Sequence, residues 1–191
     1  MKLCIDLCSG LGGFSQAFKE SRDWEVITVD IERKFKPTIR ADVNFLPIRP
    51  GLHPDVILAS PDCRYFSLAY YQFPRKGIKK ALELVGACLE AIAELEPRFW
   101  MMENPKGRLR WFIARPRNTI RLNSWGYKTA KPTDLWGNIP LGLIPGERET
   151  IPGTGWTRRR LWTKVAGSAS AAQRAKMPYE LSAAILEAVS S

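Results

Sequence analysis

The feature that most constrains the fold of this 191-residue chain is a series of short apolar segments, each ending in polar or loop-forming residues. Their length and composition are those of buried β-strands, and they cover residues 3–8, 25–30, 39–43, 55–59 and 99–105. A glycine loop and a helix start follow the first segment, and a segment with helical spacing, 82–95, precedes the last. This order predicts an α/β fold with a mostly parallel sheet and helices on both faces.

The composition is that of one packed domain with a basic surface. Hydrophobic residues make up 45% of the chain, and its formal net charge is +10. A charge this positive favours a polyanion as partner, with nucleic acid ahead of an anionic membrane surface. We find no run near the roughly 20 apolar residues that a membrane span needs. The length favours a single domain over residues 1–191.

The cysteines and the histidine argue against a metal site. Cys4, Cys8, Cys63 and Cys88 form no close Cys-x-x-Cys pair, and His53, in a predicted surface loop, is the only histidine. A zinc site is therefore not expected. We expect Cys4, Cys8 and Cys88 to pack in the core. An acid at residue 6 argues against a signal peptide, and a reducing cytoplasm fits this cysteine usage best.

The first loop has the form of a nucleotide-binding turn. Ser9, Gly10, Gly12 and Gly13 lie between the first predicted strand and a helix that begins near Phe14. Such glycines let the backbone approach a ligand closely and let the helix pack on the sheet. The spacing is not that of a phosphate-binding P-loop, because no Lys-Ser/Thr pair follows.

Acidic residues end the second and third predicted strands. Asp30 closes the second strand, where a carboxylate can accept both hydroxyls of a ribose. Asp42 lies near the end of the third strand. From its position alone, Asp30 fits a helix cap or a solvated turn equally well.

A cysteine and a glutamate follow the fourth and fifth predicted strands. Pro61 stops the fourth strand and Cys63 lies in the loop beyond it, while Glu103 and Asn104 end the fifth. Ligands bind in the crevice outside the carboxyl ends of parallel strands, and successive strands bring these ends together. We therefore expect Cys63 and Glu103 side by side, and a loop cysteine without function is the alternative.

Two stretches are basic and contain aromatic residues. Residues 64–80 carry five Lys/Arg and no acid, and residues 106–131 carry eight and no acid. Mixed aromatic and basic side chains suit stacking on bases and contact with phosphates, although aromatic residues also cover sheet edges. The candidate nucleic-acid contacts are Arg64, Arg75, Lys76, Lys106, Arg108 and Arg110.

The last third of the chain predicts two further strands and a closing helix. Residues 131–138 suggest a turn into a late strand, and residues 156–162 a strand with Arg158 and Arg160 on one face. Between them lies a loop region rich in Gly and Pro. The closing helix covers residues 179–189, with one apolar stripe and with Pro178 in its first turn.

These motifs, in this order, resemble the C5-cytosine DNA methyltransferase family. Residues 6–14 are similar to its opening methyl-donor motif, residues 60–67 to its Pro-Pro-Cys nucleophile loop, and residues 103–105 to its Glu-Asn-Val motif. The closing helix is similar to the last motif, which packs beside the first and completes the donor pocket. The resemblance covers most of the chain and is closest to compact, phage-type members.

The resemblance implies a Rossmann-like methyltransferase fold, with S-adenosylmethionine as cofactor, DNA as partner, and a prokaryotic or virus-infected host cytoplasm as location. It implies that Cys63 attacks carbon 6 of cytosine and that Glu103 protonates the ring, with Asn104, Arg158 and Arg160 completing the catalytic set. The implied donor site consists of Asp6, Ser9, Gly10, Gly12, Gly13, Phe14, Asp30, Ile31, Asp42, Val43 and Pro61.

Several departures from the family pattern bear on function. Asp62 replaces the second Pro of the nucleophile loop, and Pro105 replaces the Val. The Gln-x-Arg-x-Arg motif has no clean match: Arg158 and Arg160 are the best candidates, and residues 131–133 are the alternative. A large target-recognition domain has room only for a vestige over residues 132–156, so a partner protein is a candidate source of specificity.

Two alternatives stay open from the sequence. The same chemistry on RNA or another single strand fits the lack of a recognition domain. A basic nucleic-acid-binding module that has lost catalysis fits Asp62 and the incomplete arginine motif. The presence of both Cys63 and Glu103 argues against the second alternative, because binding alone needs neither.

Overall fold

The structure is a computed structural model that describes residues 1–46, 51–67, 77–127, 131–138 and 176–191. All structural statements below concern these ranges. Arg75 and Lys76 lie outside them, as do Arg158 and Arg160 with their predicted strand, and the greater part of the 132–156 segment.

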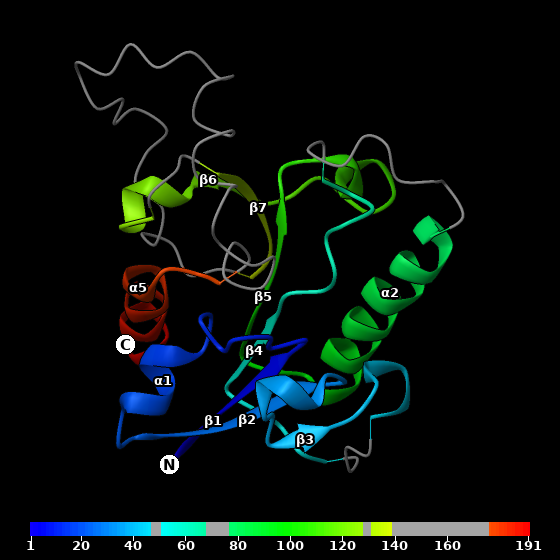
Figure 1. Cartoon of the computed structure of the whole chain (residues 1–191). Coiled ribbons are helices and arrows are strands. Elements are labelled where there is room, and N and C mark those ends of the chain that lie inside the picture. The colour runs from blue at the N-terminus through cyan, green and yellow to red at the C-terminus, as the bar shows by residue number, and fades with distance from the viewer. Residues whose placement is uncertain (47–50, 68–76, 128–130, 139–175) are drawn as a thin grey trace, which may run out of the picture.

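Within the described ranges, one seven-stranded sheet forms the centre of the molecule, in the order β3-β2-β1-β4-β5-β7-β6 (Figure 1). Neighbours from β3 to β5 pair in parallel, whereas β7 runs antiparallel to both β5 and β6. The strands are β1 (Lys2–Leu7), β2 (Trp24–Asp30), β3 (Ile39–Arg40), β4 (Val56–Ala59), β5 (Phe99–Pro105), β6 (Asn118–Arg121) and β7 (Pro132–Gly137). The predicted α/β fold with a mostly parallel sheet is confirmed.

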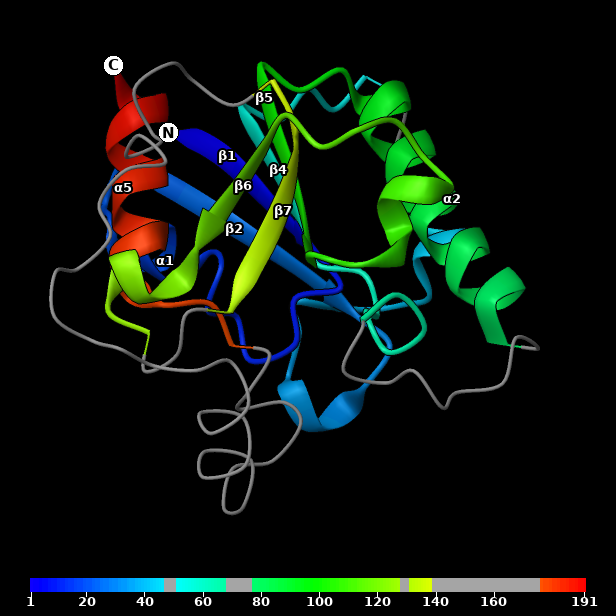
Figure 2. The same ribbon diagram turned by 90° about the horizontal axis from the view of Figure 1, so that it is seen from above.

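Helices cover both faces of this sheet. Helix α2 (Ile78–Leu95) packs on one face, and α1 (Gln16–Glu20) and α5 (Tyr179–Ser190) lie together on the other (Figures 1 and 2). Successive side chains of β4 point to opposite faces of the sheet. Ile57 packs in the core cluster under α2, and Leu58 packs in the cluster under α1 and α5. Both faces are therefore packed, as expected for a sheet of parallel strands.

The glycine loop and the closing helix are in direct contact. The hydroxyl of Ser182 in α5 donates to the carbonyl of Phe14 at 2.8 Å and accepts the N–H of Ala17 at 3.1 Å. A Cβ on Gly13 would lie 2.6 Å from the carbonyl oxygen of Met177, so only glycine fits this approach. The expectation that the closing helix packs beside the first loop is confirmed, and Pro178 is the residue that caps this helix rather than part of its first turn.

Several element boundaries differ from those expected. The third strand ends at Arg40, because the Asp42 side chain accepts the N–H of Asn44 at 3.0 Å and caps a short 3₁₀ helix, η2 (Val43–Phe45). Strand β6 was not predicted, since it lies in a basic segment without an apolar run. The sequence also predicts close packing at Gly86 in α2, and this is wrong: a Cβ there would meet no atom within 4 Å.

None of the helices in the described ranges combines the length and the apolar character that crossing a membrane requires. His53 is exposed, as expected, and Cys4 and Cys88 are fully buried. Cys8 is only partly buried, with its sulfur 4.0 Å from that of Cys88. Its φ of +55° places it in the loop rather than in β1.

Candidate active site

The carboxyl ends of β1, β2, β4 and β5 meet at one edge of the sheet. The chain order reverses around β1, which has β2 on one side and β4 on the other. Such a reversal opens the crevice in which α/β sheets bind ligands. The loop after β1 is tied to β2 by the Ser9 N–H, which donates to the Val29 carbonyl at 3.1 Å. The loop after β4 is tied to β1 by the Ser60 N–H, which donates to the Leu7 carbonyl at 3.0 Å.

The loop after β1 is hydrogen-bonded to Asp30, the acid at the end of β2. Gly10 has a φ of +52°, which favours glycine, and its N–H donates to the Asp30 carboxylate at 2.8 Å. The N–H of Glu32 donates to the other Asp30 oxygen, also at 2.8 Å. A Cβ on Gly10 would meet no atom within 4 Å. Ile31, which follows Asp30 in the chain, has 58% of its surface exposed. The arrangement holds a fixed carboxylate beside an exposed apolar side chain.

Asp6 supplies a second acid on the face covered by α1 and α5. Its carboxylate is fully buried and accepts the hydroxyl hydrogen of Ser15 at 2.5 Å. Burial raises the pKa of Asp6 to about 7, against the opposing effects of that hydrogen bond and of Lys19. The second oxygen, Oδ1, has no hydrogen-bond partner among the described residues. An unpaired buried acceptor of this kind calls for an explanation, and a donor group from a ligand is one.

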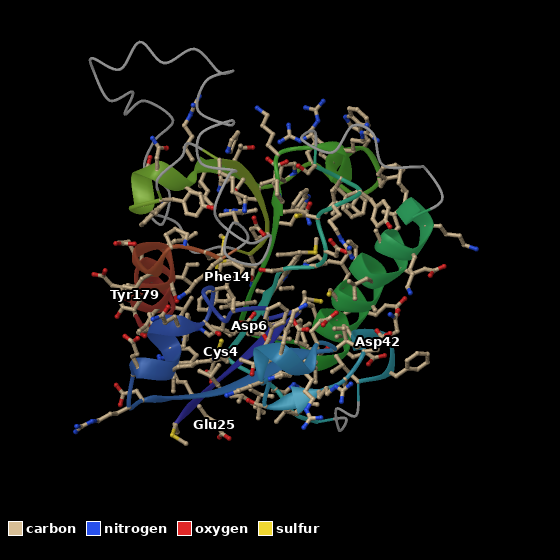
Figure 3. All side chains as sticks on the ribbon, in the orientation of Figure 1. Cys4, Asp6, Phe14, Glu25, Asp42 and Tyr179 are labelled. Carbon is tan, nitrogen blue, oxygen red and sulfur yellow. The ribbon has the colours of Figure 1, made fainter. Side chains whose placement is uncertain are left out.

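The remaining predicted donor-site residues are placed unevenly around this edge. Figure 3 shows Asp6 and Phe14 on the side of α1 and α5, and Asp42 on the side of α2. The ring of Phe14 is packed in the core, which leaves 2% of the residue exposed for contact with a ligand. Val43 and Pro61 are also buried, and the side chain of Asp42 caps η2.

The cysteine loop is fastened to the segment after β5. The Asn104 side-chain amide donates to the Pro61 carbonyl at 3.1 Å, and the Arg108 N–H donates to the Phe66 carbonyl at 2.8 Å. A Cβ on Gly107 would lie 2.2 Å from that same Phe66 oxygen. Within the loop, the Cys63 carbonyl accepts the N–H of Phe66 at 3.0 Å. These contacts fix Cys63 relative to the end of β5.

Cys63 and Glu103 lie on adjacent strand ends, as the sequence predicts, because β4 and β5 pair in parallel with Ala59 opposite Met102. The pKa of Cys63 is raised to about 11, first by burial and then by the charge of Glu103. The pKa of Glu103 is also raised, mainly by burial. The site therefore contains a thiol and a carboxyl group that both favour their protonated forms.

Lys131 is the cation that opposes both shifts. Its Nζ lies 3.8 Å from Glu103 Oε1, and both side chains are largely buried. The positive charge lowers the pKa of Glu103 and that of Cys63. Arg64, next to Cys63 in the chain, pairs instead with Asp62, with Nε 2.7 Å from Oδ2. Lys131, from the alternative segment 131–133, thus lies near the cysteine and the glutamate, while Arg158 and Arg160 lie outside the described residues.

Asp134 is a functional candidate that sequence reasoning missed. It stands opposite Asn104 in the β5–β7 pair, is fully buried, and raises the pKa of Glu103. The Arg110 guanidinium forms an ion pair with Asp134, and Thr119 donates to the same carboxylate at 2.7 Å. Arg110 was expected to contact nucleic acid; its guanidinium pairs with this buried acid, and the contact with nucleic acid stays a prediction. The signal was an isolated acid in a predicted strand that follows a long acid-free stretch.

Metal ligation has no support in the described part of the chain, where His, Cys, Asp and Glu form no cluster that could hold an ion. Lys106 is exposed and Arg108 partly exposed, directly after β5. Trp111 and Phe112 follow them at the surface.

Comparison with known proteins places this architecture among the methyltransferases. The described fold aligns with the crystal structure of a protein from an Escherichia coli prophage, described as a DNA modification methyltransferase. The TM-score is 0.50 at 18% identity, over 72% of this chain and 46% of that one. A likeness at this identity concerns the fold, which is the Rossmann-like methyltransferase fold.

The sequence comparisons are more specific. Residues 3–128 match the profile of the C-5 cytosine-specific DNA methylases. A "Probable DNA (cytosine-5)-methyltransferase" of Frog virus 3 (isolate Goorha) is 29% identical over 210 residues, covering 95% of both chains. The type II methyltransferase M.AplI of Arthrospira platensis is 30% identical over 113 residues, or 55% of this chain and 32% of the relative. The chain belongs to the C-5 cytosine-specific DNA methylase family, whose methyl donor is S-adenosylmethionine.

The described residues fit this donor. The adenosine part needs an acceptor for ribose hydroxyls and an apolar surface for the base, and Asp30 and Ile31 offer these beside the open face of Gly10. The free Asp6 oxygen offers an acceptor for a cationic or N–H group deeper in the crevice.

Proposed function

We propose that this protein transfers a methyl group from S-adenosylmethionine to carbon 5 of cytosine in DNA, through a transient covalent bond between Cys63 and carbon 6. The observation that carries the proposal is the meeting of Cys63 and Glu103 at adjacent strand ends, with Asn104 fastening the cysteine loop to β5. A thiol beside a carboxyl group whose pKa is raised by burial matches the chemical needs of this reaction.

The loops after β1, β2 and β3 would hold the donor. Asp30 would bind the ribose hydroxyls, and Ile31, Asp42 and Val43 would belong to the adenine side of the site. The backbone of Ser9, Gly10, Gly12 and Gly13 would receive the amino acid part of the molecule. S-adenosylmethionine supplies an electrophilic methyl group on a sulfonium sulfur, and the protein supplies the orientation of the base toward it.

Cys63 makes carbon 5 of cytosine reactive. Its thiolate adds to carbon 6 and forms a C–S bond, which turns carbon 5 into an enamine-like nucleophile. Carbon 5 then takes the methyl group and later releases its own proton, and the electrons of that C–H bond expel the thiolate. The pKa of about 11 means that Cys63 is a thiol in the free protein, so it must lose its proton as the base arrives.

Glu103 neutralises the negative charge on the cytosine ring by donating a proton. Addition of the thiolate places negative charge on the pyrimidine, which a proton delivered to N3 relieves. Burial raises the pKa of Glu103 toward the range in which the carboxyl keeps this proton. Lys131 lies beside it and limits the shift, so that the carboxyl can both give and recover the proton.

The covalent step is tested with DNA that contains 5-fluorocytosine. Fluorine cannot leave carbon 5 as a proton does, so the protein should remain attached to the DNA in the presence of S-adenosylmethionine and survive denaturation. Cys63→Ala should abolish both the adduct and transfer of labelled methyl to ordinary DNA. Cys4→Ala, at a buried thiol in β1 away from the crevice, is the matched control and should keep both activities.

The outcomes separate the remaining alternatives. Methyl transfer that persists in Cys63→Ala would exclude the covalent mechanism. DNA binding without affinity for S-adenosylmethionine would support a binding module instead. Faster transfer to RNA of the same sequence would change the substrate and leave the mechanism intact.

A further inference from the structure

Two aromatic side chains are exposed on the segment after β5, which contacts the proposed catalytic loop through Arg108 and Phe66. Trp111 ends the 3₁₀ helix η5 (Arg108–Trp111) with 70% of its surface exposed, and Phe112 follows with 47% exposed. The two rings are consecutive in the chain, so they expose aromatic surface at one place rather than singly. The helix that presents them is anchored by Leu109, which is fully buried.

This pair is connected to Cys63 by contacts through Phe66. The ring of Phe112 packs against that of Phe66, with the centroids 6.3 Å apart, and Phe66 is fully buried. The Phe66 N–H donates to the Cys63 carbonyl, and the Phe66 carbonyl accepts the N–H of Arg108. The exposed pair therefore occupies a fixed position relative to the thiol.

The segment that carries the pair is basic. Residues 106–117 contain Lys106, Arg108, Arg110, Arg115 and Arg117 and no acidic residue. Arg110 is occupied by Asp134, but Lys106, Arg115 and Arg117 are exposed. Cations that border an aromatic surface suit a nucleic-acid strand, because phosphates pair with the cations while bases stack on the rings.

We propose that Trp111 and Phe112 form a stacking surface for nucleotides next to the target cytosine, and that the preferred substrate is DNA that is single-stranded or locally unpaired there. The inference rests on the proposed function, since it takes Cys63 as the site of reaction. A base inside a duplex has both faces covered by its neighbours, whereas an unpaired base offers a face to an aromatic ring.

The test uses one sequence with a single cytosine in three forms: a duplex, a duplex with the cytosine and its neighbours in a bulge, and a single strand. Binding is measured by fluorescence anisotropy, and reaction by methyl transfer and by the 5-fluorocytosine adduct. We expect the bulged and single-stranded forms to bind and react about tenfold or more better than the duplex. The full chain is used throughout.

The variants isolate the role of the ring. Trp111→Ala should weaken binding of the single strand by about ten- to a hundredfold, as for loss of one stacked base, and should remove the preference over duplex. Trp111→Phe keeps a ring and should retain most of the preference. Phe45→Ala removes an aromatic side chain that is 82% exposed on η2, and it should change neither value. Binding of S-adenosylmethionine should be the same in all of them.

The two proposals fail in different ways. A preference for duplex, or a preference that survives in Trp111→Ala, would overturn the stacking surface even if the covalent adduct forms. Absence of the adduct on every substrate would overturn the proposed chemistry, while anisotropy with Trp111→Ala would still decide the stacking surface.

Discussion

At the scale of single residues, the site holds its reactive groups in their less reactive forms. Burial and the neighbouring carboxylate keep Cys63 a thiol, and burial keeps Glu103 inclined to hold its proton. Lys131 is the described cation that acts on both groups. The nearby Arg64 forms its ion pair with Asp62 instead. Burial is the largest cause of the small thiolate fraction, and the opposing charges of Glu103 and Lys131 are the next largest influences.

The first prediction concerns the pH dependence of Cys63. The pKa of about 11 lies above that of an ordinary thiol, so the thiolate fraction at neutral pH is small and grows as pH rises. Alkylation of Cys63 by iodoacetamide should accelerate about tenfold per pH unit until about pH 11. Peptide mass mapping after timed quenching measures the rate. A rate that levels off near pH 8 would contradict the raised pKa.

The second prediction uses two substitutions with opposite effects on the same thiol. Glu103→Gln removes the charge that raises the pKa of Cys63, so alkylation at pH 8 should become faster while methyl transfer is lost. Lys131→Gln removes the charge that lowers this pKa, so alkylation should become slower. Slower alkylation in Glu103→Gln would contradict the effect of the Glu103 charge on Cys63. Intact methyl transfer in this variant would contradict the assignment of Glu103 as the proton donor.

At the scale of elements, the active-site edge depends on two close contacts between segments distant in sequence. Asn104 at the end of β5 holds the Pro61 carbonyl, and Gly107 allows the chain after β5 to lie against Phe66. The two contacts act together, because both hold the cysteine loop on the segment that carries Glu103. A side chain placed between these segments should therefore separate the reacting groups.

A pair of glycine substitutions tests this dependence. Gly107→Ala would place a methyl group 2.2 Å from the Phe66 carbonyl, and the overpacking should lower the free energy of unfolding by about 1–3 kcal/mol and impair methyl transfer. Gly86→Ala, in the interior of α2, meets open space and should stabilise the protein by about 0.5–1 kcal/mol. Urea unfolding of both variants measures the difference, and equal effects would refute the close contact at Gly107.

At the scale of the whole molecule, the first loop and the last helix depend on each other across most of the chain. Ser182 bridges the Phe14 carbonyl and the Ala17 N–H, and Gly13 lies against the backbone of Met177. Under the proposed function, the donor site would therefore be complete only when α5 has docked on the opening loop. Donor affinity and global stability should be coupled for this reason.

Ser182→Ala tests the coupling. Loss of both hydrogen bonds at a fully buried site should cost about 1–3 kcal/mol of stability and weaken binding of S-adenosylmethionine. Ser190→Ala, at an exposed position of the same helix, serves as control and should change neither quantity. Calorimetric titration and thermal unfolding give the two values. Unchanged donor affinity in a destabilised Ser182→Ala variant would show that the helix stabilises the fold without shaping the crevice.

The sequence by itself determined the parallel part of the sheet, because period and polarity along one strand are local properties. It also determined that Cys63 and Glu103 lie at one edge, since the ends of neighbouring parallel strands must meet. The same local patterns explain why β6, in a basic segment without an apolar run, was not expected.

Only the tertiary structure decided which charges surround those two residues. Arg64, Arg110 and Lys131 look alike in the sequence. Asp62 pairs with the first and Asp134 with the second, while the third lies near the site, directly before the antiparallel strand β7. Pairing of charges is a long-range choice among many partners, and it is made by strand register and burial, which no local pattern specifies.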